Sequence, residues 1–279
     1  MRITRWWAVL LIGVPLAFLA AFFVAPFLVV ALNSLWTKQG AWTLDNYARA
    51  FGDLYYWGTL GLSFKLSLWV TLVTFVVGYP LAYYVAYTIQ SRAVRRLCYV
   101  VIVTPLFTSN IVRAFGWMVL LGRRGVINDS LLGLGLIERP LPLLFSELGI
   151  VIGLSYIMLP FMVLTVAAVL QNIDRTLEDA ALDLGATRFV TFLKVTFPLS
   201  LPGVIAGSLI VFTLSVSAYV TPSILSGGKS IVMSILIFQQ YASVFNFQFG
   251  ATLAVTLLVT TLILVAGYLF VLERRPRAA

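Results

Sequence analysis

The sequence predicts an all-α integral membrane protein with six transmembrane helices. Of its 279 residues, 61% are hydrophobic and only 10% are charged, whereas soluble domains carry about 25% charged residues. Six apolar runs of at least about 20 residues follow one another, and each is long enough to cross the hydrocarbon core as a helix. The strands of a membrane β-barrel would be about ten residues long and of alternating polarity, a pattern that these runs do not show.

The six predicted spans make up one transmembrane domain over residues 1–279. The first run follows a basic start and is longer than the core of a signal peptide, so we expect an uncleaved span. Pro80, Pro105 and Pro160 predict kinks in the second, third and fourth spans. Glycines spaced four apart in the fourth and fifth spans permit close contact with neighbouring helices. The expected spans are residues 8–32, 66–87, 97–121, 148–170, 201–220 and 251–271.

The cations predict that both termini are cytoplasmic. Six spans place the termini on one side, and with that side inside, the inner segments hold eleven Lys and Arg residues against seven in the outer segments. The short segment 89–96 alone carries Arg92, Arg95 and Arg96. This bias follows the positive-inside rule. It also accounts for the net charge of +9 as an attraction to anionic membrane lipid, and no basic soluble domain is present to bind nucleic acid.

Residue usage excludes most enzyme chemistry. The chain has no histidine, and its single cysteine, Cys98, lies in the third predicted span. It therefore offers no disulfide, no Cys/His metal site and no Ser-His triad. The stretch Leu-Ser-Gly-Gly-Lys-Ser at 225–230 looks like a nucleotide motif, but Ser223 stands where a phosphate loop needs glycine. We interpret it as a Gly-rich turn on the outer side and expect no catalytic residue and no metal.

The loop between the fourth and fifth spans, residues 172–198, predicts two short helices. Thr176 and Asp179 have the spacing of a capping box at the start of the first helix. Gly185 suits the left-handed position that ends it. The first helix is expected to show one apolar stripe, formed by Leu177, Ala180, Ala181 and Leu184.

The second helix of the loop is expected over residues 188–195. Thr187 would cap it, and Pro198 would stop it. On amphipathicity alone the loop is either an ordinary surface hairpin or an element that transmits a partner's motion into the fourth and fifth spans.

The loop resembles the EAA loop of binding-protein-dependent ABC importer permeases, which reads Glu-Ala-Ala-x3-Gly-x9-Ile-x-Leu-Pro. This chain has Asp-Ala-Ala at 179–181, Gly185 and Val-Thr-Phe-Pro at 195–198, so Asp, Val and Phe replace Glu, Ile and Leu. The resemblance implies the MetI-like permease fold, in which this loop forms coupling helices seated in a groove of a separate ATPase. It assigns the coupling role to Glu178, Asp179, Ala180, Ala181, Gly185 and Pro198.

Four other segments are similar to the first permease of spermidine/putrescine-type importers. The resemblance implies a permease subunit that carries polyamines or a related small organic amine through a bacterial inner membrane. The chain itself would hold no cofactor, since ATP and Mg²⁺ would bind to a cytoplasmic ATPase dimer. A second homologous permease and a periplasmic binding protein are the other partners implied. The segments are WTLDNYARAF at 42–51, GYPLAYYVA at 78–86, NIVRAFGWMVLLGRRGVIN at 110–128 and YVTPSILSGG at 219–228.

The residues expected along the substrate path leave the cargo open. A polycation calls for carboxylates and aromatic faces, yet no predicted span contains Asp or Glu, and Ala218 stands where polyamine permeases often carry an acid. Arg113 either snorkels, pairs with an acid of a partner subunit, or lines the path. In the path it would suit an opine, an aminoalkylphosphonate or another zwitterionic or anionic cargo. The expected path residues are Ser109, Asn110, Arg113, Trp117, Ser217 and Tyr219.

Two other classes of membrane protein fit the residues less well. A membrane-embedded enzyme would need acids, histidine or cysteine placed within the spans. A secondary transporter would need carboxylates for coupling ions at mid-membrane, usually together with internal repeats. The sequence shows neither set.

Overall fold

The computed structural model describes residues 5–37 and 39–273. Contacts between Cα atoms divide the chain into two compact units. The first holds the described residues up to Leu60 together with those from Met233 onward, and the second is Gly61–Val232. The described residues are mostly helical, and the isolated bridge Trp36–Trp42 is their one β pairing. Lys38 and the cations of both terminal tails lie outside the described residues.

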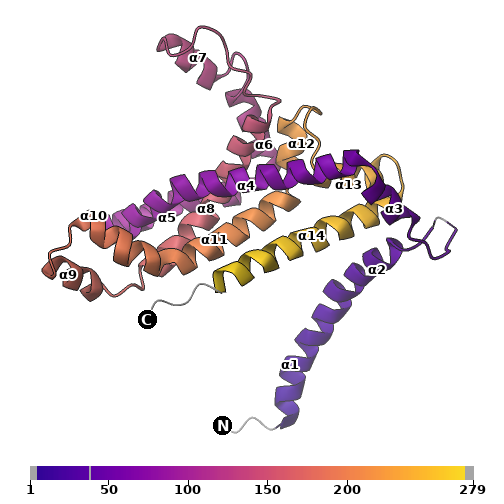
Figure 1. The fold of residues 1–279 in the computed structure, drawn as a ribbon, viewed down its shortest axis with the longest axis horizontal. Helices are drawn as coiled ribbons and strands as arrows, with labels where there is room; N and C mark the ends of the chain where they lie inside the picture. The colour runs from indigo at the N-terminus through magenta and orange to yellow at the C-terminus, as the bar shows by residue number, and fades with distance from the viewer. Residues whose placement is uncertain (1–4, 38, 274–279) are drawn as a thin grey trace. The chain divides into compact units, whose positions relative to one another are not determined.

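The first unit places the N-terminal helices with the C-terminal helix (Figure 1). The apolar stretch Leu11–Asn33 has no buried residue in its most hydrophobic window. α14 packs against α13, α2 and α3. The elements are α1 (Arg5–Leu19), the π turn η1 (Ala20–Val24), α2 (Ala25–Asn33), α3 (Asp45–Gly52), α13 (Met233–Ala242) and α14 (Phe247–Glu273), with the start of α4 (Leu54–Tyr83).

An aromatic and polar cluster holds α14 in this unit. The Phe249 ring is fully buried and meets the edge of Tyr56, with ring centroids 5.3 Å apart. The Arg49 guanidinium lies 4.6 Å from the Phe249 centroid, a cation–π distance. Thr252 donates a buried hydrogen bond to the Ser34 carbonyl at 3.1 Å. These contacts join α3, α4 and the end of α2 to α14.

The second unit is centred on α8 and α11. They are beside each other in Figure 1, and Gly207 of α11 approaches so closely that a Cβ would lie 2.4 Å from Oγ1 of Thr165 on α8. The elements are the rest of α4, η2 (Tyr84–Thr88), α5 (Arg92–Val103), η3 (Thr104–Phe107), α6 (Asn110–Leu120), α7 (Val126–Gly133), α8 (Glu147–Leu170), α9 (Thr176–Asp183), α10 (Arg188–Thr191), η4 (Phe192–Thr196), α11 (Phe197–Ser217) and α12 (Val220–Leu225).

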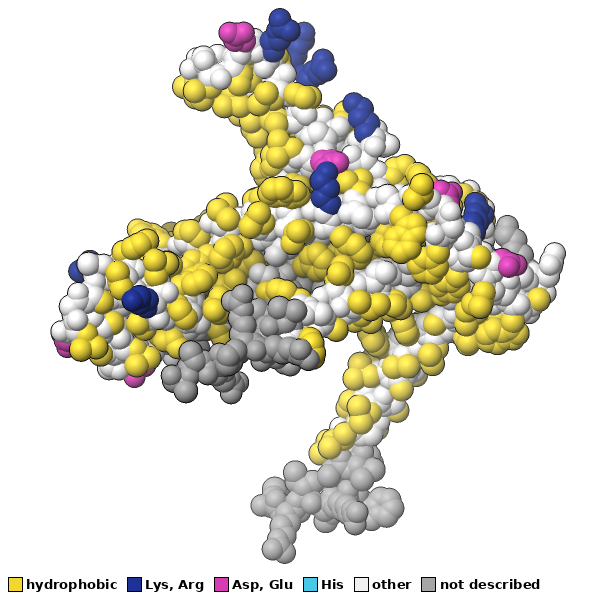
Figure 2. All heavy atoms as spheres, viewed as in Figure 1, with side chains coloured by type: hydrophobic (Ala, Val, Ile, Leu, Met, Phe, Trp, Pro, Cys, Tyr) yellow, Lys and Arg dark blue, Asp and Glu magenta, His cyan; other side chains and the backbone are white. Residues whose placement is uncertain are grey.

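Polar contacts tie other helices of the second unit to this pair. The Tyr79 hydroxyl of α4 and the Ser200 hydroxyl of α11 are 2.8 Å apart and share a buried hydrogen bond. Gln171, which follows α8, donates to the Tyr99 hydroxyl of α5. Figure 2 shows hydrophobic side chains over long stretches of the helices and only scattered charged side chains. This distribution agrees with helices that cross a bilayer.

Within residues 5–37 and 39–273, five helices are long and apolar enough to cross a membrane, or six if one bent pair counts as a span. The first, fourth and sixth predicted spans agree with Leu11–Asn33, Glu147–Leu170 and Phe247–Phe270. The third predicted span, 97–121 with a kink at Pro105, falls on the bent pair of helices. There Arg92–Phe107 and Asn110–Gly133 meet at 100°.

The break in the third span has a local cause. Pro105 lies at the start of a 3₁₀ turn that ends at Phe107, and Thr108 is extended. Ser109 then caps α6 by accepting a hydrogen bond from the Ile111 amide at 3.3 Å. The capped start gives the chain a new helix direction.

The second and fifth predicted spans begin inside longer helices. The helix of the second begins at Leu54, and Lys65 lies within it and forms an ion pair with Glu147 at 2.6 Å. The helix of the fifth begins at Arg188, because α10, η4 and α11 follow one another without a break. Its helix ends at Ser217 rather than 220.

Candidate functional site

The loop that joins α8 to α11, residues 172–198, forms two helical arms around Gly185. The first arm, α9, is not started by the predicted capping box, because Arg175 is its N-cap residue and makes no side-chain cap bond. Instead Oδ1 of Asp174 accepts a hydrogen bond from the Thr176 amide at 3.0 Å. Asp side chains commonly bond to the backbone two residues on. The Thr176 amide thereby lowers the pKa of Asp174 below its ordinary value.

Gly185 ends the first arm as predicted. Its φ is +86°, the left-handed region that favours glycine. The Gly185 amide donates to the Leu182 carbonyl at 2.9 Å, and the Ala186 amide donates to the Ala181 carbonyl at 3.0 Å. These two bonds define a Schellman motif. The direction of the chain after α9 is therefore set by one glycine.

The second arm starts as predicted but does not stop at Pro198. Thr187 caps α10 by accepting from the Val190 amide at 3.4 Å. The helix then continues through the π turn η4 into α11, where Pro198 occupies the first turn. Proline has no amide hydrogen to donate, and the π turn just before it already interrupts the regular α-helical hydrogen bonds. The loop is thus continuous with the fifth span.

Side-chain contacts fix the loop to the ends of α4 and α11. The Thr196 hydroxyl of η4 donates to Oε1 of Glu178 on α9. The Arg175 guanidinium lies 4.4 Å from the centroid of the Tyr87 ring. The Phe192 ring meets the edge of Tyr83, with centroids 5.4 Å apart. The sequence did not predict the contacts made by Thr196, Arg175 and Tyr87, because each contact joins residues far apart in the sequence.

The loop exposes apolar side chains on both sides of Gly185. Leu184 is 90% exposed and Phe189 is 70% exposed, and Leu177, Leu182 and Leu193 are exposed as well. The predicted stripe on α9 is therefore not covered by this chain: only Ala181 is half-buried, while Ala180 is exposed. We call Leu184, Phe189 and Ala180 the docking face, and we call residues 172–198, which carry it, the docking loop. Several exposed apolar side chains on one short loop are typical of an interaction surface.

The predicted coupling residues have different places in this loop. Asp179, Ala180 and Gly185 are exposed, whereas Glu178 is half-buried and bonded to Thr196. Pro198 is exposed at the start of α11. Glu178 thus holds the loop together, and the exposed residues are the ones that a partner can reach.

The predicted path residues lie on α6 and at the break between α11 and α12. α12 packs on both α6 and α8, so the structure brings these elements together. Ser217 ends α11 with its hydroxyl donating to the Thr213 carbonyl at 3.2 Å, and Tyr219 is the N-cap residue of α12. The extended Ala218 between them breaks the helix. Non-helical backbone at membrane depth is tolerated where it is buried in protein or lines a wet cavity.

Arg113 is held within the second unit. Its Nη2 donates to Oδ1 of Asn110, one turn earlier on α6. Its Nε and Nη1 are buried and have no hydrogen-bond partner in the described chain. Trp117, one further turn along, meets the edge of Tyr156 on α8 at a centroid distance of 5.5 Å. Tyr156 was missed because an aromatic residue in an apolar run gives no signal by itself.

Comparisons with known proteins agree with this architecture. The family model described as "Binding-protein-dependent transport system inner membrane component" matches residues 76–277. The spermidine/putrescine transport system permease protein PotB of Escherichia coli is 33% identical over 245 residues, covering 86% of this chain and 88% of that protein. The inner membrane ABC transporter permease protein YdcU of Escherichia coli is 30% identical over 269 residues, covering 87% of this chain and 82% of that protein.

Among solved structures, the fold is similar to that of a bacterial ABC transporter involved in the import of the acidic polysaccharide alginate. The TM-score is 0.79 at 18% identity, with 99% of this chain and 98% of that chain covered. An inward-facing methionine ABC transporter, MetNI, gives a TM-score of 0.55 at 18% identity and covers 79% of this chain and 94% of that one. The expected MetI-like fold is confirmed. The chain belongs to the family of inner membrane components of binding-protein-dependent transport systems.

Proposed function

We propose that this chain is one of two permease subunits of an ATP-driven importer for polyamines or a related small organic amine. The observation that carries the substrate class is the similarity to PotB, at 33% identity over 88% of that protein. The chain then lies in a bacterial inner membrane with both termini in the cytoplasm. A homologous permease completes the pathway, and a periplasmic binding protein delivers the cargo.

The docking face supports a cytoplasmic ATPase dimer as the partner of the loop. Leu184 and Phe189 are exposed on the two sides of Gly185, whose left-handed conformation sets the direction of the chain between them. Glu178 ties the same loop to the base of α11 through Thr196. A movement of a partner seated on the docking face would therefore reach the fifth span through a hydrogen bond and a continuous helix. ATP and Mg²⁺ would bind to the ATPase.

A second cargo class is favoured by the charges. Within the described spans Arg113 has two buried guanidinium nitrogens without hydrogen-bond partners. Glu147 stands at the first residue of α8 and is already paired with Lys65. The Arg113 guanidinium, which no acid of the described chain neutralises, therefore suits the carboxylate of an opine or the phosphonate of an aminoalkylphosphonate better than it suits a polycation.

Uptake by the reconstituted complex separates the two cargo classes. The complex is placed in proteoliposomes with ATP inside, and its binding protein is loaded with labelled spermidine, putrescine or an aminoalkylphosphonate. The proposal expects ATP-dependent uptake of spermidine or putrescine. Uptake of the phosphonate alone would contradict the polyamine proposal and support the second cargo class.

Co-purification tests the transport machinery itself. The tagged chain is expected to bring a second permease and an ATPase from the membrane. A chain that purifies alone and drives uptake with an ion gradient would instead be a secondary transporter.

A further inference from the structure

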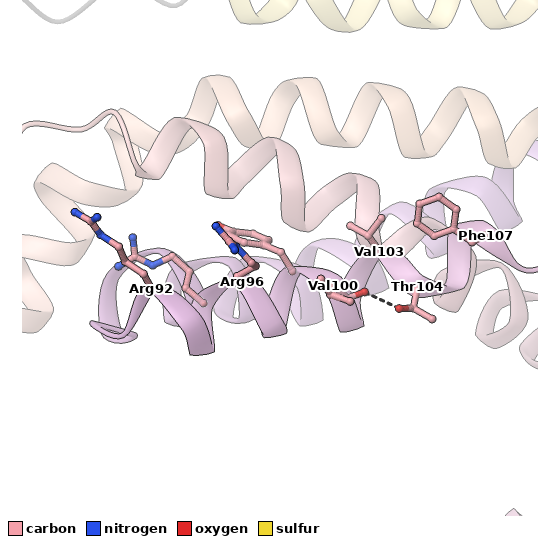
Figure 3. Close-up of a pocket in the computed structure, with 8 residues that line it drawn as sticks. Arg92, Arg96, Val100, Val103, Thr104 and Phe107 are labelled. Atoms are coloured by element: carbon pink, nitrogen blue, oxygen red, sulfur yellow. Dashed lines mark hydrogen bonds between the residues drawn. The ribbon is translucent and has the colours of Figure 1, made fainter.

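A groove of about 600 Å³ runs along α5 and η3 and has two chemically different ends. Figure 3 shows Arg92 and Arg96 towards one end of the helix and Val103 and Phe107 towards the other. Arg95 lines the groove as well. The groove belongs wholly to the second unit and plays no part in the docking loop or the predicted path.

The basic end is not neutralised within the described chain. Lys65–Glu147 is the one ion pair among the residues that the structure describes, so none of the three arginines of the groove is paired with an acid there. Arg92 and Arg96 are exposed. Arg95 donates from Nη2 to the Ile89 carbonyl at 2.6 Å, and its Nε is buried without a hydrogen-bond partner. One arginine is thus held in place while two others stand free to meet an anion.

The apolar end continues on the same side of the helix. Val100 is 56% exposed and Phe107 is 86% exposed, and both line the groove with Val103. Positions 96, 100, 103 and 107 follow the spacing of one helical face. From Arg96 to Phe107 a helix covers about 16 Å, which is close to half of a hydrocarbon core of about 30 Å. The face therefore has the length of a single lipid leaflet.

We propose that this groove binds an anionic phospholipid. Its phosphate and headgroup lie among Arg92, Arg95 and Arg96, and an acyl chain lies along Val100, Val103 and Phe107. Arginine forms charge-assisted hydrogen bonds with phosphate, and anionic lipid attracts basic residues at the membrane surface. A soluble anion would use only the basic end, and an apolar segment of another protein would leave the arginines unneutralised. An anionic lipid satisfies both ends at once.

Native mass spectrometry of the intact complex tests the proposal. The complex is stripped of lipid in detergent and titrated with phosphatidylglycerol or with phosphatidylcholine, and the bound lipids are counted. The wild-type complex is expected to retain phosphatidylglycerol in preference to phosphatidylcholine. The double variant Arg92→Gln with Arg96→Gln should bind phosphatidylglycerol at least about tenfold more weakly. The matched control, Arg123→Gln with Arg124→Gln, removes the same charge from the α6–α7 connection and should bind as the wild type does.

Two further arms identify the occupant. Phe107→Ser should weaken phosphatidylglycerol binding without changing the assembly of the complex, because Phe107 is exposed. Inorganic phosphate at millimolar concentration should not displace the lipid. Equal retention of the two lipids by the wild type, or unchanged binding by the Arg92→Gln, Arg96→Gln variant, would overturn the proposal. So would displacement by phosphate, which identifies a soluble-anion site, or a cross-link from residue 103 to a partner subunit, which identifies a protein interface.

Discussion

The Thr196 hydroxyl donates a hydrogen bond to Oε1 of Glu178, which joins the first arm of the docking loop to the base of the fifth span. Thr196 is only 1% exposed. Removing the acceptor would leave a buried hydroxyl unsatisfied, which costs about 1–3 kcal/mol. The bond therefore ties α9 to the base of the fifth span, and under the proposed function it would transmit movement of the ATPase to that span.

Glu178→Leu is expected to lower binding-protein-stimulated ATP hydrolysis several-fold while the complex still assembles. Glu178→Gln is the matched control, because its amide oxygen can still accept from Thr196. It should remain within about twofold of the wild type. The assay is ATP hydrolysis by the reconstituted complex with and without loaded binding protein. Wild-type stimulation in the leucine variant would show that the bond does not transmit coupling.

Gly185→Val is expected to abolish transport and stimulated ATP hydrolysis without preventing membrane insertion. The φ of +86° is strained for a side chain branched at Cβ, at a cost of about 1–2 kcal/mol, although a Cβ itself would meet nothing within 4 Å. The strain should turn α9 away from the ATPase. Gly185→Asn is the control, since Asn adopts the left-handed region more readily. Normal uptake by the valine variant would show that the loop is an ordinary surface hairpin with no role in coupling.

Leu184→Ser with Phe189→Ser is expected to release the ATPase from the complex. The two side chains are 90% and 70% exposed, so their loss removes little packing inside this chain. Apolar anchors at the centre of an interface contribute about 2 kcal/mol or more, and the amount of co-purified ATPase should fall accordingly. Leu134→Ser, at a side chain 73% exposed, is the control. Full recovery of the ATPase with the double variant would show that the ATPase interface lies elsewhere on the chain.

Gly227→Ala is expected to lower thermal stability more than Gly228→Ala. Both glycines have positive φ, +55° and +78°, so both substitutions introduce backbone strain. A Cβ at Gly227 would also lie 2.4 Å from Cδ1 of Phe145, whereas one at Gly228 would meet nothing within 4 Å. Overpacking adds about 1–3 kcal/mol. The measurement is the unfolding midpoint in detergent, and equal midpoints would mean that the Phe145 ring moves aside freely.

Arg188 is expected to be cytoplasmic and Lys229 periplasmic. Both side chains are exposed, so single cysteines at these positions, in a Cys98→Ala background, are accessible to a maleimide that cannot cross the inner membrane. In intact cells the label should reach Lys229→Cys, and it should reach Arg188→Cys only after lysis. The reverse pattern would invert the topology.

Features set by neighbouring residues could be predicted from the sequence. Gly185 and Thr187 end and start helices through hydrogen bonds to residues at most a few positions away, and these positions are recognisable from residue type. Pro105 indicated a kink for the same reason. Its angle could not be predicted, because it depends on the cap that Ser109 makes after the break.

Features set by distant partners could not be predicted. Lys65 shortened the predicted second span because a lone cation interrupts an apolar run, but Glu147 neutralises it in the folded chain. Thr196 gave no sign of its bond to Glu178. The capping box failed because Asp174 competes for the same end of α9. In each case the sequence showed the residue and not its partner.

The π turn Phe192–Thr196 determines how a deletion in this part of the chain would affect the direction of the docking loop. A π turn closes its hydrogen bonds over one residue more than an α turn, and each residue in an α-helix rotates what precedes it by about 100°. The π turn therefore accommodates one extra residue while the helix continues, so deleting one residue here should restore a regular α turn and leave α9 facing nearly the same way. Deleting one residue within the regular helix of α11 would instead rotate α9 about the axis of the fifth span by about 100°. Homologous chains should therefore tolerate a one-residue deletion at 192–196 better than one within α11.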